Sequence, residues 1–356
     1  MFNKNNYTTK DSAMMFLFSV IAVFCFSIFM SNLIGVISGL TQVDINIVAS
    51  YKWVNYLNMF LSAVVFLLVF VIYNFVKKKD FVVATKLKVK FDLKIFIGVV
   101  VLSALLMFAC INPTGLFNHI FSLINSQTVS NTLAFTIDNF GSFILVVFLL
   151  AVLPAVCEEL VFRGVIYNGL RQKFSTLFSV LISAGLFTLI HFSIYKTFYQ
   201  FILGVVLALL VHYTGSIVYS MIYHFVNNFI IILFSYISPT KSLFEFTSWG
   251  AKEIVLTIVF LIVAALIAYL FFKILKNYTY KHKNYFNIQT TNKPLGEIET
   301  SDEKFEKENI DTKNLSEYDK KLLLTQNRGV SDTGWLFIAA LVAIIIWSFN
   351  SFGGFL

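Results

Sequence analysis

The sequence predicts an all-α protein that crosses a membrane several times. Of its 356 residues, 58% are hydrophobic and only 13% are charged, and the mean hydropathy is +0.79. A soluble domain of this length would be about half apolar and about a quarter charged. The apolar residues form runs that approach or exceed the roughly 20 residues that a helix needs to span the hydrocarbon core. Because backbone groups in lipid must be satisfied internally, and the runs show no period-2 alternation, we expect helices rather than a barrel.

Nine apolar runs mark the expected helices. We expect about eight of them to form a transmembrane bundle over residues 1–276, and the ninth to be a short C-terminal helix within 334–356 that spans, tilts or lies at the interface. The runs lie near residues 13–37, 53–76, 95–112, 142–170, 174–194, 197–213, 216–237, 254–275 and 335–349. The first run is long for a signal peptide and has no clean cleavage site, so we interpret it as an uncleaved helix.

The distribution of lysine and arginine indicates the orientation. Residues 77–94 carry seven lysines against two aspartates, and further basic turns follow at Arg171 and Lys173 and between Lys273 and Lys283. These segments fall on one side if each of the first eight runs spans once. Since cytoplasmic loops are enriched in Lys and Arg, we expect a multi-pass protein of the cell membrane with a cytoplasmic N-terminus. The same loops account for the net charge of +8, so nucleic acid is not an expected partner.

Residues 277–333 differ from the rest of the chain. They contain nine Lys or Arg and ten Asp or Glu residues and few large apolar ones. Such a composition cannot bury a core, so we expect a polar, flexible cytoplasmic linker.

The expected helix at 142–170 contains charges that need an explanation. An ionisable group at membrane depth costs roughly 2.5–3.5 kcal/mol, yet Glu158, Glu159 and Arg163 all lie in this run. Glu159 and Arg163 are four residues apart and share a helix face, so they can pair, whereas Glu158 points about 100° away. A solvated helix end is the alternative, but Arg171 marks the interface and Glu158 lies about 20 Å deeper.

Two later helices carry polar side chains at a similar depth. His191 follows Phe187 by four residues, and His224 precedes Asn228 by four, which places each pair on one helix face. Counted from the expected cytoplasmic ends, these groups lie within about one to two helical turns of Glu158. The sequence therefore predicts a shared polar cavity formed by three helices.

This set of side chains matches the requirements of peptide hydrolysis. A carboxylate and a histidine can take a proton from water as the water attacks a carbonyl, and a second histidine with an amide can stabilise the oxyanion. Zinc held by Glu158, His191 and His224 is an alternative, because zinc binds His and Glu and activates water. We favour no cofactor, because Asn is a poor zinc ligand and no HExxH motif is present. The three cysteines lie in apolar runs and form neither a disulfide framework nor a CxxC module.

The three motifs, taken in order, resemble those of the CPBP family. They are EExxxR at Glu158, FxxxH ending at His191 and HxxxN beginning at His224, and the resemblance covers residues 142–237. The family includes type II CAAX prenyl endopeptidases and bacterial bacteriocin-processing or self-immunity (Abi) proteins. The resemblance implies a catalytic set and a supporting pair. The catalytic set is Glu158, Glu159, His191, His224 and Asn228, with Glu159 serving as partner of Arg163, and the supporting residues are Arg163 and Phe187.

By this resemblance, Glu158 and His191 activate water, while His224 and Asn228 form the oxyanion site. The expected substrate is a small or membrane-associated peptide or protein, with or without a lipid modification, which binds from the lipid bilayer. Bacterial peptide processing or bacteriocin self-immunity fits the Phe-, Ile-, Lys- and Asn-rich composition. Two alternatives remain at this point: a non-catalytic immunity or scaffold protein, and a proton-coupled transporter, for which mid-membrane carboxylates are typical. The oligomeric state is not predicted.

Overall fold

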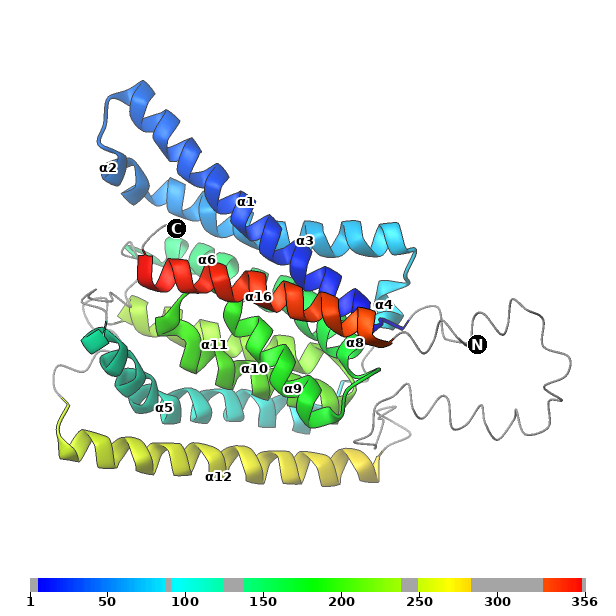
Figure 1. Cartoon of the computed structure of the whole chain (residues 1–356). Helices are drawn as coiled ribbons and strands as arrows, with labels where there is room; N and C mark the ends of the chain where they lie inside the picture. The colour runs from blue at the N-terminus through cyan, green and yellow to red at the C-terminus, as the bar shows by residue number, and fades with distance from the viewer. Residues whose placement is uncertain (1–5, 88–90, 125–136, 238–248, 283–328, 354–356) are drawn as a thin grey trace, which may run out of the picture.

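The computed structural model describes residues 6–87, 91–124, 137–237, 249–282 and 329–353. These residues form helices, and no strand occurs among them. The predicted all-α polytopic bundle is therefore confirmed (Figure 1). Seven helices of the described part are long and apolar enough to cross a membrane. Many large apolar side chains on their outer faces are exposed, as expected where lipid replaces water.

Two long helices, α1 and α3, form one side of the bundle. Helix α1 spans Thr9–Thr41 and α3 spans Lys52–Lys77, with the short α2 (Ile45–Ser50) between them. The C-terminal helix α16 (Gly329–Gly353) packs against α1 and α9, which spans Thr176–Leu189 (Figure 1).

The opposite side consists of α5 (Leu93–Ile124) and α12 (Ala251–Lys281), which pack along each other (Figure 1). Helix α5 continues through Pro113, so the loop expected from residue 113 begins later. Helix α12 runs into the segment expected as a linker from residue 277. Most of that segment, 283–328, lies outside the described residues.

The middle of the bundle contains one composite helix and three shorter partners. The composite helix is built from α6 (Phe140–Val147), η1 (Phe148–Val152), α7 (Leu153–Glu159), η2 (Leu160–Tyr167) and α8 (Asn168–Leu170). Its partners are α9, α10 (Ile194–Thr214) and α11 (Val218–Ile237). With 14 residues, α9 is about 21 Å long and too short for a full crossing. It ends before the expected limit of residue 194.

The basic segments lie at one end of the bundle. The end of α3, the turn after α8 and the end of α12 all lie at the end where α1 begins (Figure 1). Two hydrogen bonds hold the start of α1 there. Ser12 Oγ donates to the carbonyl of Ile166 over 2.8 Å, and Thr9 Oγ1 donates to that of Gly169 over 3.3 Å. The N-terminal segment is thereby tied to η2 and α8.

The close packing of α9 and α10 generates a stability prediction. A Cβ added to Gly204 would lie 2.9 Å from Ala184 Cα, so Gly204→Ala forces two helix backbones apart. We expect a loss of about 1–3 kcal/mol, measured as a lower unfolding midpoint of the purified protein.

Gly185→Ala is the matched control, because its added Cβ meets nothing within 4 Å. It should leave stability unchanged or raise it by about 0.5–1 kcal/mol, since alanine is the better helix former. Equal melting of both variants would contradict the packing argument.

Candidate active site

The composite helix places Glu158 and Glu159 between two π-helical segments. Helix α7, which ends at Glu159, is preceded by η1 and followed by η2. π-helical turns are rare and occur frequently at functional sites, because they shift the side-chain register of a helix. Pro154 lies in the same irregular stretch. It has no N–H, so it cannot donate to the carbonyl of Leu150, four residues earlier.

Glu159 and Arg163 form a fully buried ion pair. Both side chains have 0% exposure, and Arg163 Nη1 donates to Glu159 Oε1 over 2.7 Å. The expected i,i+4 pairing is confirmed. Arg163 Nη2 also donates to the carbonyl of Gly204 over 3.1 Å, and its guanidinium lies 4.4 Å from the centre of the Phe187 ring. The pair thus links the composite helix to α9 and α10.

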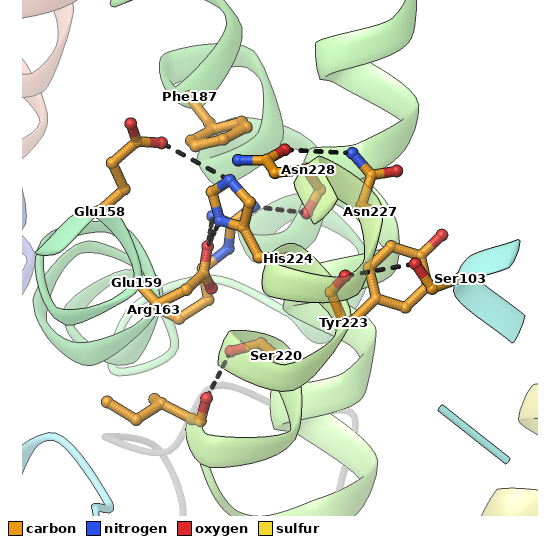
Figure 2. A network of polar contacts seen from close by, with 12 residues as sticks. Ser103, Glu158, Glu159, Arg163, Phe187, Ser220, Tyr223, His224, Asn227 and Asn228 are labelled. Carbon is orange, nitrogen blue, oxygen red and sulfur yellow. Dashed lines mark hydrogen bonds and ion pairs between the residues drawn. The ribbon is translucent and has the colours of Figure 1, made fainter. Parts of the chain in front are cut away.

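His224 lies between the two glutamates (Figure 2). Its Nδ1 is 3.1 Å from Glu159 Oε1, and its Nε2 is 4.0 Å from Glu158 Oε2. Since the Glu159 oxygen also accepts from Arg163, we assign the imidazole proton to Nδ1. Glu159 therefore orients the ring, and the ring presents Nε2 towards Glu158. The Glu158 side chain is 16% exposed, which separates it from the fully buried Glu159.

His191 lies in the turn after α9 rather than inside a helix as expected. Its Nδ1 is 2.8 Å from the carbonyl oxygen of Phe187. A carbonyl only accepts, so Nδ1 carries the proton and Nε2 has a free lone pair. The next residue, Phe192, has a φ of 45°, a left-handed conformation that bulky residues rarely adopt. Such strained positions occur at functional sites more often than elsewhere.

Phe187 connects the two histidines. Its ring contacts His191 edge to face, with centroids 5.0 Å apart, and contacts His224 in the same way at 6.0 Å. In the described part of the chain no hydrogen bond joins His191 to Glu158, His224 or Asn228, so the Phe187 ring is the link between the two histidines.

Asn228 is bonded to the irregular turn of the composite helix. Its Nδ2 donates to the carbonyl of Leu150 over 3.0 Å, which is the carbonyl that Pro154 cannot serve. An amide nitrogen has two hydrogens, so the second remains for a ligand. Because the Leu150 carbonyl can only accept a hydrogen bond, the nitrogen of the Asn228 amide must face it.

Asn227 and Tyr199 are not among the residues expected from the sequence. Asn227 Nδ2 donates to Asn228 Oδ1 over 3.3 Å, and the Tyr199 hydroxyl donates to Asn227 Oδ1 (Figure 2 shows the two amides). Asn227 is 1% exposed, so its amide is held entirely by protein groups. The adjacent Asn-Asn dipeptide was visible in the sequence, but the contact with Tyr199 on α10 is a tertiary contact.

The alternative zinc set is not gathered. No three His, Cys, Asp or Glu side chains come together as a metal-binding group among the described residues. The Nδ1 atoms of His191 and His224 already face Phe187 and Glu159. Their Nε2 atoms stay available, so zinc at Glu158, His191 and His224 is put to the test under the proposed function, and the chemistry below uses the protein's own groups.

Together these groups form a polar cluster within the helical bundle. One carboxylate is neutralised by arginine, and a second faces a histidine of α11. A further histidine lies in the turn after α9, and an amide lies on α11. An arrangement of this kind can activate a water molecule and bind an oxyanion within a helical bundle.

A comparison with family models gave a match over the middle of the chain. Residues 140–230 match the model described as type II CAAX prenyl endopeptidase Rce1-like. The match covers the composite helix, α9, α10 and most of α11, and confirms the resemblance to the CPBP intramembrane proteases. Comparisons with curated proteins and with solved structures gave no match.

The buried ion pair generates a second stability prediction. Arg163→Met leaves Glu159 without its cation, and Glu159→Gln leaves Arg163 without its anion. We expect each to cost about 3–5 kcal/mol, because an uncompensated buried charge is left. The double variant should lose less than the sum, measured from unfolding midpoints in one detergent.

Lys52→Met serves as the control, because Lys52 and Asp138 form an exposed ion pair. It should change stability by about 0–1 kcal/mol. Strict additivity of the two buried substitutions would argue against their direct coupling.

Proposed function

We propose that this protein is an intramembrane endopeptidase that hydrolyses a peptide bond with an activated water molecule. The observation that supports it best is the position of Glu158. It faces His224 Nε2 at 4.0 Å, while its neighbour Glu159 is committed to Arg163. One carboxylate is thereby structural, and the other is placed to act on a bound molecule.

In the proposed reaction, Glu158 and the lone pair of His191 Nε2 act on one water molecule. Its proton passes to this base as its oxygen bonds to the carbonyl carbon of the substrate. The electron pair of the carbonyl moves to the oxygen, which accepts hydrogen bonds from Asn228 Nδ2 and from His224 when its Nε2 is protonated. The carbon–nitrogen bond then breaks, and the departing amine takes the proton that the base holds.

The proposed substrate is a small or membrane-associated peptide or protein, with or without a lipid modification, that reaches the site from the membrane. Bacterial peptide processing or bacteriocin self-immunity is the proposed role. We also propose that the protein resides in the cell membrane with its N-terminus in the cytoplasm, because the basic segments gather at the end where α1 begins.

Substitution of the base tests the reaction. We expect Glu158→Gln and His191→Ala each to lower peptide cleavage about 10²–10⁴-fold, because the proton acceptor is lost. The assay compares processing at equal expression and equal melting temperature.

Two substitutions of the same type outside the site are the controls. Glu253 is an N-terminal residue of α12, and His119 stacks on Trp249. Glu253→Gln and His119→Ala should keep full activity. If both site variants also keep full activity or full immunity, a non-catalytic immunity or scaffold role replaces the proposal. Proton transport that depends on Glu158, without any cleaved product, would favour a transporter.

Chelation tests the metal-free scheme. We expect cleavage to be unchanged after treatment with a strong zinc chelator, because the proposed base and oxyanion groups belong to the protein. Loss of activity on chelation with recovery on added zinc would overturn this scheme and restore zinc at Glu158, His191 and His224.

A further inference from the structure

A second polar region lies at the end of the composite helix, away from the proposed catalytic groups. Tyr167 and Arg171 are four residues apart and share a helix face. Both are buried, with 1% and 3% exposure. The Tyr167 hydroxyl is buried and has no hydrogen-bond partner among the described residues, and Arg171 Nη1 donates to the carbonyl of Phe174 over 2.7 Å. A buried hydroxyl of this kind is costly unless a ligand completes it.

Lys86 approaches this region from the turn after α4 (Phe81–Ala84). The turn can lie against η2 because Gly164 has no side chain, since a Cβ there would be 2.9 Å from the Thr85 methyl. Lys86 itself has a φ of 60°, a left-handed conformation. Burial and then the Arg171 guanidinium lower the pKa of Lys86 to about 8. The surroundings of Lys86 therefore destabilise its charged form, and they do not neutralise it with an anion.

An imidazole, which can donate a hydrogen bond without being charged, comes from the last turn of α10. His212 lies within electrostatic range of Arg171, Lys86 and Lys276, the last from α12. The neighbouring Tyr213 lies within range of Tyr167 and packs on Phe272 of α12, with ring centroids 5.7 Å apart. Lys86 and His212 thus lie within range of Arg171, which shares a helix face with the buried Tyr167.

Helix C-termini explain part of this arrangement but not all of it. Cations near the last carbonyls of α8 and α10 are favoured by the helix dipole. That effect does not supply a partner for the Tyr167 hydroxyl. No described carboxylate forms an ion pair with Lys86 or His212. A single anion with several acceptor oxygens would accept a hydrogen bond from the Tyr167 hydroxyl. The same anion would also offset the charge of the nearby cations.

We propose that Tyr167, Arg171, Lys86 and His212 form a binding site for a phosphate group. Leu170 is the last residue of the membrane-spanning composite helix, so the site lies at the level of lipid headgroups. The favoured source is the phosphate of an anionic phospholipid, and free phosphate offers the same chemistry. This site does not depend on the proposed hydrolysis.

The test uses the full-length protein purified in neutral detergent. Its melting temperature is measured with phosphatidic acid, with phosphatidylcholine and with inorganic phosphate. We expect phosphatidic acid to raise the midpoint more than phosphatidylcholine does. Lys86→Gln should weaken the apparent affinity about tenfold, as expected for loss of a charge-assisted hydrogen bond.

Tyr167→Phe is the sharper variant, because it removes only the hydroxyl that lacks a partner. Without anion it should melt at the same temperature as the wild type or higher, which shows that it folds. With phosphatidic acid it should lose at least half of the wild-type shift. Lys10→Gln is the control for charge, since Lys10 is exposed at the same end of the bundle.

The outcomes separate the ligand sources. A shift by inorganic phosphate alone that depends on Tyr167 and Lys86 would support the site with a soluble ligand. An unchanged shift in Tyr167→Phe would overturn the proposal. So would a loss in Lys10→Gln as large as in Lys86→Gln, because general surface charge would then explain the binding.

Discussion

The buried ion pair between Glu159 and Arg163 constrains most of the surrounding structure. Neither charge can reach water, so each must be satisfied by protein groups at membrane depth. Arg163 does this with Glu159, the Gly204 carbonyl and the face of Phe187, which brings α9 and α10 onto the composite helix. The second consequence is chemical. The same Glu159 oxygen accepts from His224, so the pair that holds the helices together also sets the direction of the imidazole.

Departures from regular helix supply the remaining positions. Pro154 removes one hydrogen bond from the composite helix, and Asn228 donates to the affected Leu150 carbonyl. Asn227 donates to the oxygen of the Asn228 amide, and Tyr199 in turn donates to Asn227. In lipid, a helix irregularity must be satisfied by neighbouring side chains. The hydrogen bond that satisfies the Leu150 carbonyl therefore also orients Asn228, which is proposed to bind the oxyanion.

The parts of this arrangement that depend on local spacing could be predicted from the sequence. Hydropathy indicated the helices, and the four-residue spacing indicated the pairing of Glu159 with Arg163. The end of α9 could not be predicted, because apolar residues continue past Leu189 into the turn that contains His191. Nor did the hydropathy pattern reveal that α5 continues beyond Pro113. The contacts of His224 with both glutamates and of Tyr199 with Asn227 join separate helices, and no spacing rule encodes them.

The central proposal is that the polar groups activate water and that no covalent intermediate forms. Analysis of the cleavage product is its most direct test. The purified protein would be reconstituted with lipidated and unmodified membrane peptides in ¹⁸O-labelled water containing hydroxylamine. The account predicts a new peptide C-terminus carrying one ¹⁸O atom and no hydroxamate. A hydroxamate product would reveal an acyl-enzyme and contradict direct attack by water. Absence of any new terminus, with folded protein and the full peptide set, would contradict hydrolysis itself.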